Sequence, residues 1–198
     1  MDDTHSDPGV WKRQLREQWS NVAQGWRSRW AAFEQGAQPL SDRMMNLAHV
    51  ALGQRVLDVA TGIGEPAMTA ARKVGPSGSV VAIDQASQML AVARERMQAA
   101  GIPTVEFIEG DAEAMTLPLD SFDAVVCRWG LMFFHDPVGA LARFRNSLVP
   151  GGWLAVAIWG EPKLVPMISL PFSVLSRKPG RPPSLPSGPN PFALSDQR

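Results

Sequence analysis

The stretch that decides the fold runs from Val56 to Pro66 and reads VLDVATGIGEP. Its first residues are aliphatic and β-branched around a single acid, a composition typical of a buried strand. The strand pattern stops at Gly62 and Gly64, which allow positive φ angles and leave room for a ligand to approach the main chain. Pro66 suits the first turn of a following helix, because its missing N–H would be unpaired there. The stretch therefore predicts a strand, a glycine turn and a helix, a unit that holds nucleotide-like ligands over the carboxyl end of a parallel strand.

Two classes of cofactor use this unit. The spacing Gly62-x-Gly64-x-x-Ala67 satisfies the loose dinucleotide fingerprint, and Asp84 stands twenty residues beyond Gly64, where a ribose-binding acid is expected. A carboxylate in this place can accept hydrogen bonds from both ribose hydroxyls. A nicotinamide dinucleotide is therefore one alternative, although the chain has no tyrosine for a catalytic Tyr-Lys pair.

Further acidic positions do not belong to the dinucleotide fingerprint. Asp58 lies inside the strand before the glycines, and the sequence GDAE at 110–113 follows a third predicted strand. Together with Asp84, these acids resemble the class I S-adenosylmethionine-dependent methyltransferases, whose first motif reads roughly LDxGxGxG. Ala60 stands here in the place of the first glycine. The resemblance is strongest over residues 55–160 and points to the small-molecule group that includes the ubiquinone and menaquinone C-methyltransferases.

The resemblance implies an α/β fold with a doubly wound, Rossmann-like sheet, S-adenosylmethionine as cofactor, and a small-molecule acceptor that is methylated on carbon or oxygen. Asp84 would hold the ribose, Asp111 would accept from the adenine amine, and Met89 would either pack on the adenine or belong to the core. By the family's motifs, the cofactor-binding positions are Asp58, Ala60, Thr61, Gly62, Gly64, Asp84, Gln85, Met89, Asp111, Ala112 and Arg128.

The sequence assigns no catalytic residue. The sulfonium of S-adenosylmethionine already carries an activated methyl group, so the protein mainly has to align donor and acceptor and exclude water. A base is needed only where the acceptor must lose a proton early. His135 is the histidine near the expected site and the candidate for that role. The competing interpretation is that His135 merely precedes a helix capped by Asp136, with Pro137 at its first position.

Composition excludes several other classes. The 198 residues are 45% hydrophobic and 19% charged with a formal net charge of zero, which fits one globular α/β domain and offers no basic field for nucleic acid. The single Cys127 excludes an intrachain disulfide framework and a cysteine-based metal cluster, so we expect no metal. No apolar run approaches the roughly 20 residues needed to span a bilayer. We therefore expect a cytoplasmic protein without a membrane span.

The first part of the chain divides into a disordered terminus at 1–9 and a helical cap at 10–53. A helix is predicted from about 11 to 35, with a second at about 40–50 that Ser41 or Asp42 would cap. Large apolar side chains recur at intervals of three and four, which places them near one helical face. They are Trp11, Leu15, Trp19, Val22, Trp26, Trp30 and Phe33. The aromatic rings among them are either ordinary packing surface or, for Trp26 or Trp30, a lid over the cofactor.

The core is predicted at 54–160, with five parallel strands, and is followed by a proline-rich segment at 161–198. Nine of the seventeen prolines lie between 162 and 191. Family members generally continue with another helix and two strands, so the final antiparallel hairpin is expected to be missing here and the last strand to expose an edge. Such an edge predicts self-association. Two alternatives to a methyltransferase remain: an NAD(P)-dependent oxidoreductase, and a non-catalytic S-adenosylmethionine-binding or truncated remnant.

Overall fold

A five-stranded, wholly parallel sheet forms the centre of the molecule. The computed structural model describes residues 8–176 and 189–196. The strands are β1 (Arg55–Val59), β2 (Ser79–Asp84), β3 (Val105–Glu109), β4 (Phe122–Arg128) and β5 (Leu148–Ala157). They are ordered β3-β2-β1-β4-β5, and each neighbouring pair is parallel. This order confirms the predicted doubly wound, Rossmann-like fold.

The order of the strands reverses at β1, which has β2 on one side and β4 on the other. Chain connections leave in opposite directions from this point, so a crevice opens outside the carboxyl ends of β1 and β4. The glycine turn that follows β1 lies at this crevice. The fold therefore places the loop that the sequence singles out at the position where open α/β sheets bind their ligands.

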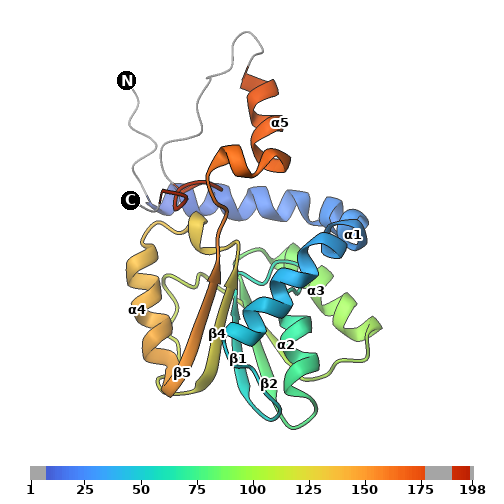
Figure 1. Ribbon diagram of the computed structural model, residues 1–198, viewed down its shortest axis with the longest axis vertical. Coiled ribbons are helices and arrows are strands. Elements are labelled where there is room, and N and C mark those ends of the chain that lie inside the picture. The colour runs from blue at the N-terminus through green and yellow to red at the C-terminus, as the bar shows by residue number, and fades with distance from the viewer. Residues whose placement is uncertain (1–7, 177–188, 197–198) are drawn as a thin grey trace.

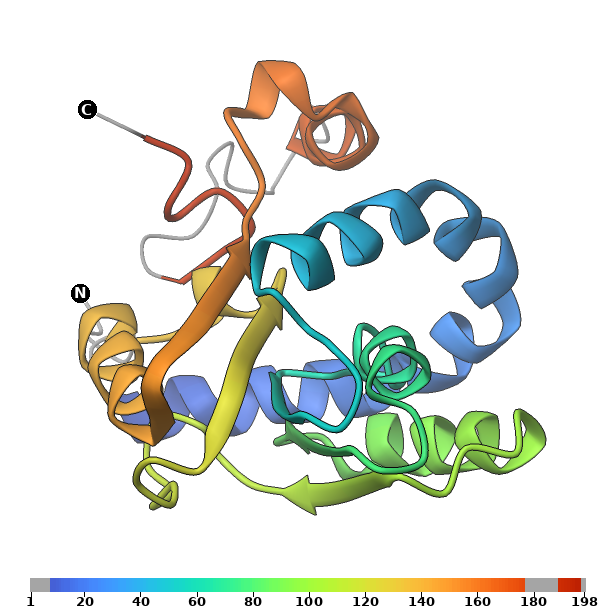
Figure 2. The same ribbon diagram turned by 60° about the horizontal axis from the view of Figure 1, so that its bottom comes forward.

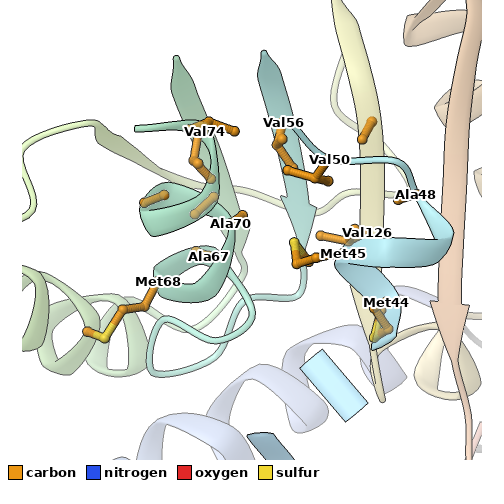
Figure 3. Close-up of a cluster of buried hydrophobic side chains, with 14 of the residues drawn as sticks. Met44, Met45, Ala48, Val50, Val56, Ala67, Met68, Ala70, Val74 and Val126 are labelled. Carbon is orange, nitrogen blue, oxygen red and sulfur yellow. The ribbon is translucent and has the colours of Figure 1, made fainter. Parts of the chain in front are cut away.

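Helices cover both faces of the sheet (Figure 1). On one face lie α2 (Ala67–Val74), α3 (Ser87–Ala99) and the last turns of the N-terminal helix, which share a core with alternate residues of the strands. Figure 3 shows Met44, Met45 and Ala48 of that last part beside Val56 and Val126. The other face is covered by α4 (Pro137–Ser147). Its buried Phe144 packs against the strand side chains that point away from α2 and α3. Asp136 caps α4 as predicted, since its Oδ1 accepts from Gly139 N at 2.9 Å.

The N-terminal cap is one helix, α1 (Pro8–Leu47), and the prediction of two helices with a break near residue 36 was wrong. The helix bends instead of ending, and Figure 2 shows its first arm (blue) and last arm (cyan) on different lines. Gly25, Gly36 and Pro39 are the kinds of residue at which helices bend. Ser41 is therefore inside a helix and does not cap one. Of the segment predicted to be disordered, 1–7 lies outside the described residues, and Pro8 and Gly9 begin α1.

A short 3-10 helix, Leu131–Phe133, lies between β4 and α4. After β5 come a second 3-10 helix, Pro162–Leu164, and α5 (Pro166–Ser176). Strand β5 begins earlier than predicted, because the Pro150-Gly151-Gly152 turn is accommodated within it. It pairs with β4 on one side and forms one edge of the sheet, and Trp153 on this strand is half exposed. No strand follows β5 within residues 8–176 and 189–196. Self-association through this edge stays a prediction. In the described part of the chain, no helix is long and apolar enough to cross a bilayer.

Candidate cofactor and acceptor site

A cavity of about 470 Å³ lies at the carboxyl ends of the strands, a volume within the range of small-molecule sites. Its floor comes from the loops after β1, β2, β3 and β4, and α1 lies across it. Nine of the eleven positions predicted to bind cofactor line this cavity. They are Ala60, Thr61, Gly62, Asp84, Gln85, Met89, Asp111, Ala112 and Arg128.

Asp84 joins the glycine loop to the end of β2. Its Oδ2 accepts from Gly62 N at 2.8 Å and its Oδ1 from Ala86 N at 2.9 Å. Burial raises the pKa of this carboxyl group, and its backbone hydrogen bonds oppose that effect. Ala60 takes a left-handed conformation with φ of 57°, so the residue in place of the first glycine keeps the glycine-like turn at some cost in strain. The loop is therefore held in shape before any ligand binds.

The two glycines of the loop serve different purposes. A Cβ built on Gly62, whose φ is +56°, would meet no atom within 4 Å, because this residue faces the open cavity. A Cβ on Gly64, whose φ is +96°, would lie 3.2 Å from the Cβ of Ala93 in α3. Gly64 thus allows the loop to pack on α3 and does not line the cavity. A ligand can approach the main chain at Gly62.

Asp58 lies behind the loop, not in the lining of the cavity. The residue is fully buried, and neither carboxylate oxygen has a hydrogen-bond partner within residues 8–176 and 189–196. Burial raises the pKa of Asp58 to about 7; the charge of Arg128 opposes this rise and the charge of Glu65 adds to it. The hydroxyl of Thr61 is also buried and unpaired. Orphaned acceptors beside a ligand cavity fit a cofactor that carries an ammonium group, as S-adenosylmethionine does.

Asp111, the predicted adenine acceptor, is held by α1. Lys12 Nζ donates to Asp111 Oδ2 at 2.8 Å and lies 3.0 Å from Glu113 Oε2, while Asp111 Oδ1 accepts from Glu113 N. Burial alone would lower the pKa of Lys12, but its hydrogen bonds and the two negative charges raise it overall. The first arm of α1 is thereby fastened over the loop that follows β3.

Arg128, at the end of β4, forms a buried ion pair with α1. Its Nη1 and Nη2 donate to the two carboxylate oxygens of Glu34 at 3.1 and 3.2 Å, and Nη1 also donates to Ser41 Oγ at 2.8 Å. The Arg128 and Glu34 side chains are 4% and 11% exposed, so this bidentate pair is shielded from water. Arg128 lines the cavity as predicted, with its guanidinium engaged by protein groups.

Glu65 and Arg96 complete this charged cluster, and sequence reasoning named neither. Glu65 is buried in the lining of the cavity, and its Oε2 accepts from the hydroxyl of Thr69 at 2.8 Å. Burial raises the pKa of Glu65, and the nearby charge of Glu34 acts in the same direction. Arg96 donates to the carbonyl of Ile63 and stands 3.8 Å over the ring of Trp30. Of this cluster, Glu65 and Arg128 line the cavity, at the side of β1 and β4.

A continuous row of six aromatic rings forms part of the cavity wall. Successive rings are 4.3 to 6.5 Å apart between centroids. In order of contact the row is Phe133, Trp19, Trp26, Phe33, Trp129 and Trp159, and all six line the cavity. The helical spacing predicted that the α1 rings share a face, but did not predict that rings after β4 and β5 would extend them.

Two other residues lie away from this arrangement. His135 is exposed and is not part of the cavity lining, so the structure does not bring it together with the predicted cofactor positions. Cys127 is fully buried, and burial raises the pKa of its thiol to about 12. These are the surroundings of an unreactive, buried thiol.

Comparison with known proteins identifies the class. Residues 56–152 match the model of a methyltransferase domain family. Aklanonic acid methyltransferase DauC from Streptomyces sp. (strain C5) is 37% identical over 117 residues, 59% of this chain and 53% of DauC. The ubiquinone/menaquinone biosynthesis C-methyltransferase UbiE from Erwinia tasmaniensis is 38% identical over 116 residues, 58% of this chain and 46% of UbiE.

A solved structure agrees with the sequence relatives. A SAM-dependent methyltransferase from Aquifex aeolicus aligns with a TM-score of 0.54 at 25% identity, covering 59% of this chain and 62% of that one. The chain therefore contains a class I S-adenosylmethionine-dependent methyltransferase domain, homologous to UbiE and DauC. It spans about half the length of the curated relatives it matches.

Proposed function

We propose that the chain transfers a methyl group from S-adenosylmethionine to a small, flat, ring-containing acceptor, on carbon or oxygen. The observation that carries this proposal is that one cavity joins a polar floor, suited to a nucleoside with an amino-acid tail, to a wall of aromatic rings. When bound, S-adenosylmethionine supplies an activated methyl group on its sulfonium sulfur. Ala60, Thr61, Gly62, Asp84, Gln85, Met89, Asp111 and Ala112 would bind this cofactor, and Asp58 would act on it only through its charge from behind the loop. Gly64 would shape the loop, and Arg128 would join the floor to α1.

The floor supports the cofactor part of the proposal. The acidic residues Asp111 and Asp84 follow the adjacent strands β3 and β2, and Gly62 follows β1, so adenine, ribose and amino-acid positions would succeed one another along the sheet edge. Met89 is buried in the same lining, where its thioether can cover a purine face. The family to which this domain belongs uses the same cofactor.

The aromatic wall supports the acceptor class. Six rings with edge-to-face, tilted and stacked contacts present apolar faces and few hydrogen-bonding groups, so they favour a flat apolar molecule over a charged chain. The relatives DauC, an aklanonic acid methyltransferase, and UbiE, a C-methyltransferase of ubiquinone and menaquinone biosynthesis, are consistent with such an acceptor. The rings also exclude water from the space in which the methyl group would move.

The oxidoreductase alternative rests on the same ribose position, because Asp84 would suit either cofactor. Titration calorimetry of the purified chain with S-adenosylmethionine, S-adenosylhomocysteine and NADH separates the alternatives. We expect saturable binding of the first two and none of NADH. Incubation with methyl-labelled cofactor and a panel of hydroxylated naphthalenes and matched aliphatic alcohols should then label the aromatic compounds. Binding of NADH alone would overturn the assignment, and binding without labelling of any acceptor would favour a non-catalytic binding protein.

A further inference from the structure

One carboxylate oxygen in the lining of the cavity accepts no hydrogen bond from the described part of the chain. Both oxygens of Asp84 and both oxygens of Asp111 accept protein hydrogen bonds, and Glu113 uses one oxygen for Lys12 and the other for a backbone N–H. Glu65 uses only Oε2. Within the described part of the chain, Oε1 of Glu65 has no hydrogen-bond partner, although the residue is only 5% exposed and lines the cavity.

The position of Glu65 along the sheet edge limits what it can meet. The cofactor orientation given under the proposed function, on which this inference rests, places adenine beside β3 and ribose beside β2. The remaining amino-acid end must then lie past the glycine loop, toward β1 and β4. Glu65 follows that loop directly and lines the cavity together with Arg128 from the end of β4.

The charges around Glu65 are unbalanced in favour of a cation. Three buried carboxyl groups, those of Asp58, Glu34 and Glu65, interact with two guanidinium groups, those of Arg96 and Arg128. Arg128 is already paired with Glu34, and Arg96 donates to a backbone carbonyl and covers an indole ring. A further cation, Arg72, acts on Arg96 but is exposed to solvent. With all three carboxyl groups ionised, this cluster carries one more negative than positive charge, so it favours the ammonium group of an amino acid over its carboxylate beside Glu65.

Glu65 is also fixed in place before a ligand arrives. Its Oε2 accepts from the hydroxyl and the backbone N–H of Thr69, and the same hydroxyl accepts from Gln38 Nε2 at 3.0 Å. These contacts fix the carboxylate, so Oε1 has a defined position but no protein partner within the described residues. This is the arrangement expected of a group that binds one donor with fixed geometry.

We propose that Oε1 of Glu65 accepts a hydrogen bond from the α-ammonium group of S-adenosylmethionine, so that Glu65 is the residue that recognises the amino-acid end of the cofactor. Asp58 stands behind the same loop as a second negative group without direct access to the cavity. The binding affinity of an adenosine thioether or sulfonium that carries an amino acid should therefore depend on Glu65. The affinity of a similar compound without the amino acid should not.

The test compares two ligands on two proteins. S-adenosylhomocysteine carries the amino-acid end, and 5′-methylthioadenosine lacks it. By calorimetry, Glu65→Gln should weaken S-adenosylhomocysteine by about 10- to 100-fold, since a hydrogen bond between charged groups is lost. It should leave 5′-methylthioadenosine within about two-fold, which also shows that the variant site is folded. The control Glu95→Gln, at a half-exposed residue paired with Arg27 on the surface, should change neither affinity.

A second variant keeps the carboxylate and loosens it. Thr69→Val removes the hydroxyl that holds Oε2, and should weaken S-adenosylhomocysteine by a smaller factor than Glu65→Gln, again without affecting 5′-methylthioadenosine. Equal losses for both ligands, or no loss for either, would overturn the proposal. Unchanged S-adenosylhomocysteine affinity with slower methyl transfer would make Glu65 a base and overturn it too. If the unmodified chain binds neither S-adenosylhomocysteine nor S-adenosylmethionine, the proposed function itself fails and this inference falls with it.

Discussion

The glycine loop after β1 and the helix α1 form opposite sides of one cavity, and they are built in different ways. The loop is organised by contacts at shorter separations in sequence, such as that of Gly62 with Asp84, 22 residues apart. Helix α1 is fixed by Glu34 to Arg128 and by Lys12 to Asp111, at separations of 94 and 99 residues. In the proposed function the loop recognises the cofactor, and α1 encloses the cavity. A domain of this kind can therefore keep its local binding motif while its enclosure depends on a few long-range polar contacts.

The largest effect is expected from breaking the buried ion pair that joins α1 to the end of β4. Glu34→Ala leaves the guanidinium of Arg128 buried without its partner, and removing one member of a buried pair typically costs about 3–5 kcal/mol. Chemical denaturation should show this loss in the free energy of unfolding. S-adenosylhomocysteine affinity should fall as well, because α1 would no longer close the cavity.

The matched control for this variant changes both partners. Glu34→Leu combined with Arg128→Met removes both charges and retains apolar volume, so it should recover much of the lost stability. If Glu34→Ala costs less than about 1 kcal/mol, the ion pair does not hold α1 to the core.

The next largest effect concerns Asp58, behind the loop. Its pKa in the folded protein, about 7, exceeds the ordinary value of 3.8, so the protonated form is favoured by folding. The contribution of Asp58 to the free energy of unfolding is fully present below pH 3.8. It is lost as pH rises toward 7 and beyond, by about 4 kcal/mol at most. Asp58→Asn should therefore stabilise the ligand-free protein at pH 8 and give no advantage near pH 4.

Melting curves across this pH range, with and without S-adenosylhomocysteine, measure the effect. Bound ammonium should favour the ionised Asp58 and so reduce the advantage of the variant at pH 8. The same change at Asp42, which is exposed, should stay within about 0.5 kcal/mol at every pH. An Asp58→Asn protein that is less stable than the parent at pH 8 would contradict the burial argument.

Asp84 tests the loop itself. Asp84→Ala removes the proposed ribose acceptor and also the acceptor for Gly62 N, so the affinity for S-adenosylmethionine should fall by about 2–4 kcal/mol. Asp84→Asn keeps one oxygen acceptor and should lose less. Calorimetry at constant salt gives both values. A parent-like affinity in Asp84→Ala would remove this residue from the cofactor site.

The loop could be predicted from sequence because its determinants are adjacent. The glycines, the acid in the strand and the spacing to Asp84 together indicate a ligand at the end of a parallel strand, and the structure places that loop at the cavity. The pairing of Glu34 with Arg128 has no comparable local signal. A glutamate in an amphipathic helix is ordinarily solvated, and its partner follows 94 residues later.

The continuity of α1 was also beyond local reasoning. Gly36 and Pro39 favour a break, and a proline inside a helix costs about 3 kcal/mol. Tertiary contacts oppose that cost: Arg128 donates to Ser41, and Met44 and Met45 are buried against the sheet. The rings of α1 were predicted to share a face, but whether they would be core or cavity wall depends on what lies opposite them, which only the fold reveals.

The smallest effect is expected from Lys12→Met, and it tests most directly whether the glycine loop and α1 have separate roles. Lys12→Met removes the contacts of α1 with the partly exposed Asp111 and with the less exposed Glu113, so stability should fall by about 1 kcal/mol, and less at high salt. Asp111 Oδ2 would then be free for the adenine amine, and affinity for S-adenosylhomocysteine should rise by a few-fold. Stability and affinity would thus move in opposite directions, whereas Glu34→Ala lowers both. Arg13→Met, one residue along on the exposed face, is the control and should change neither. If Lys12→Met weakens binding, then the first arm of α1 contributes to affinity by closing the cavity, and the division between a recognising loop and an enclosing helix does not hold at this end of the site.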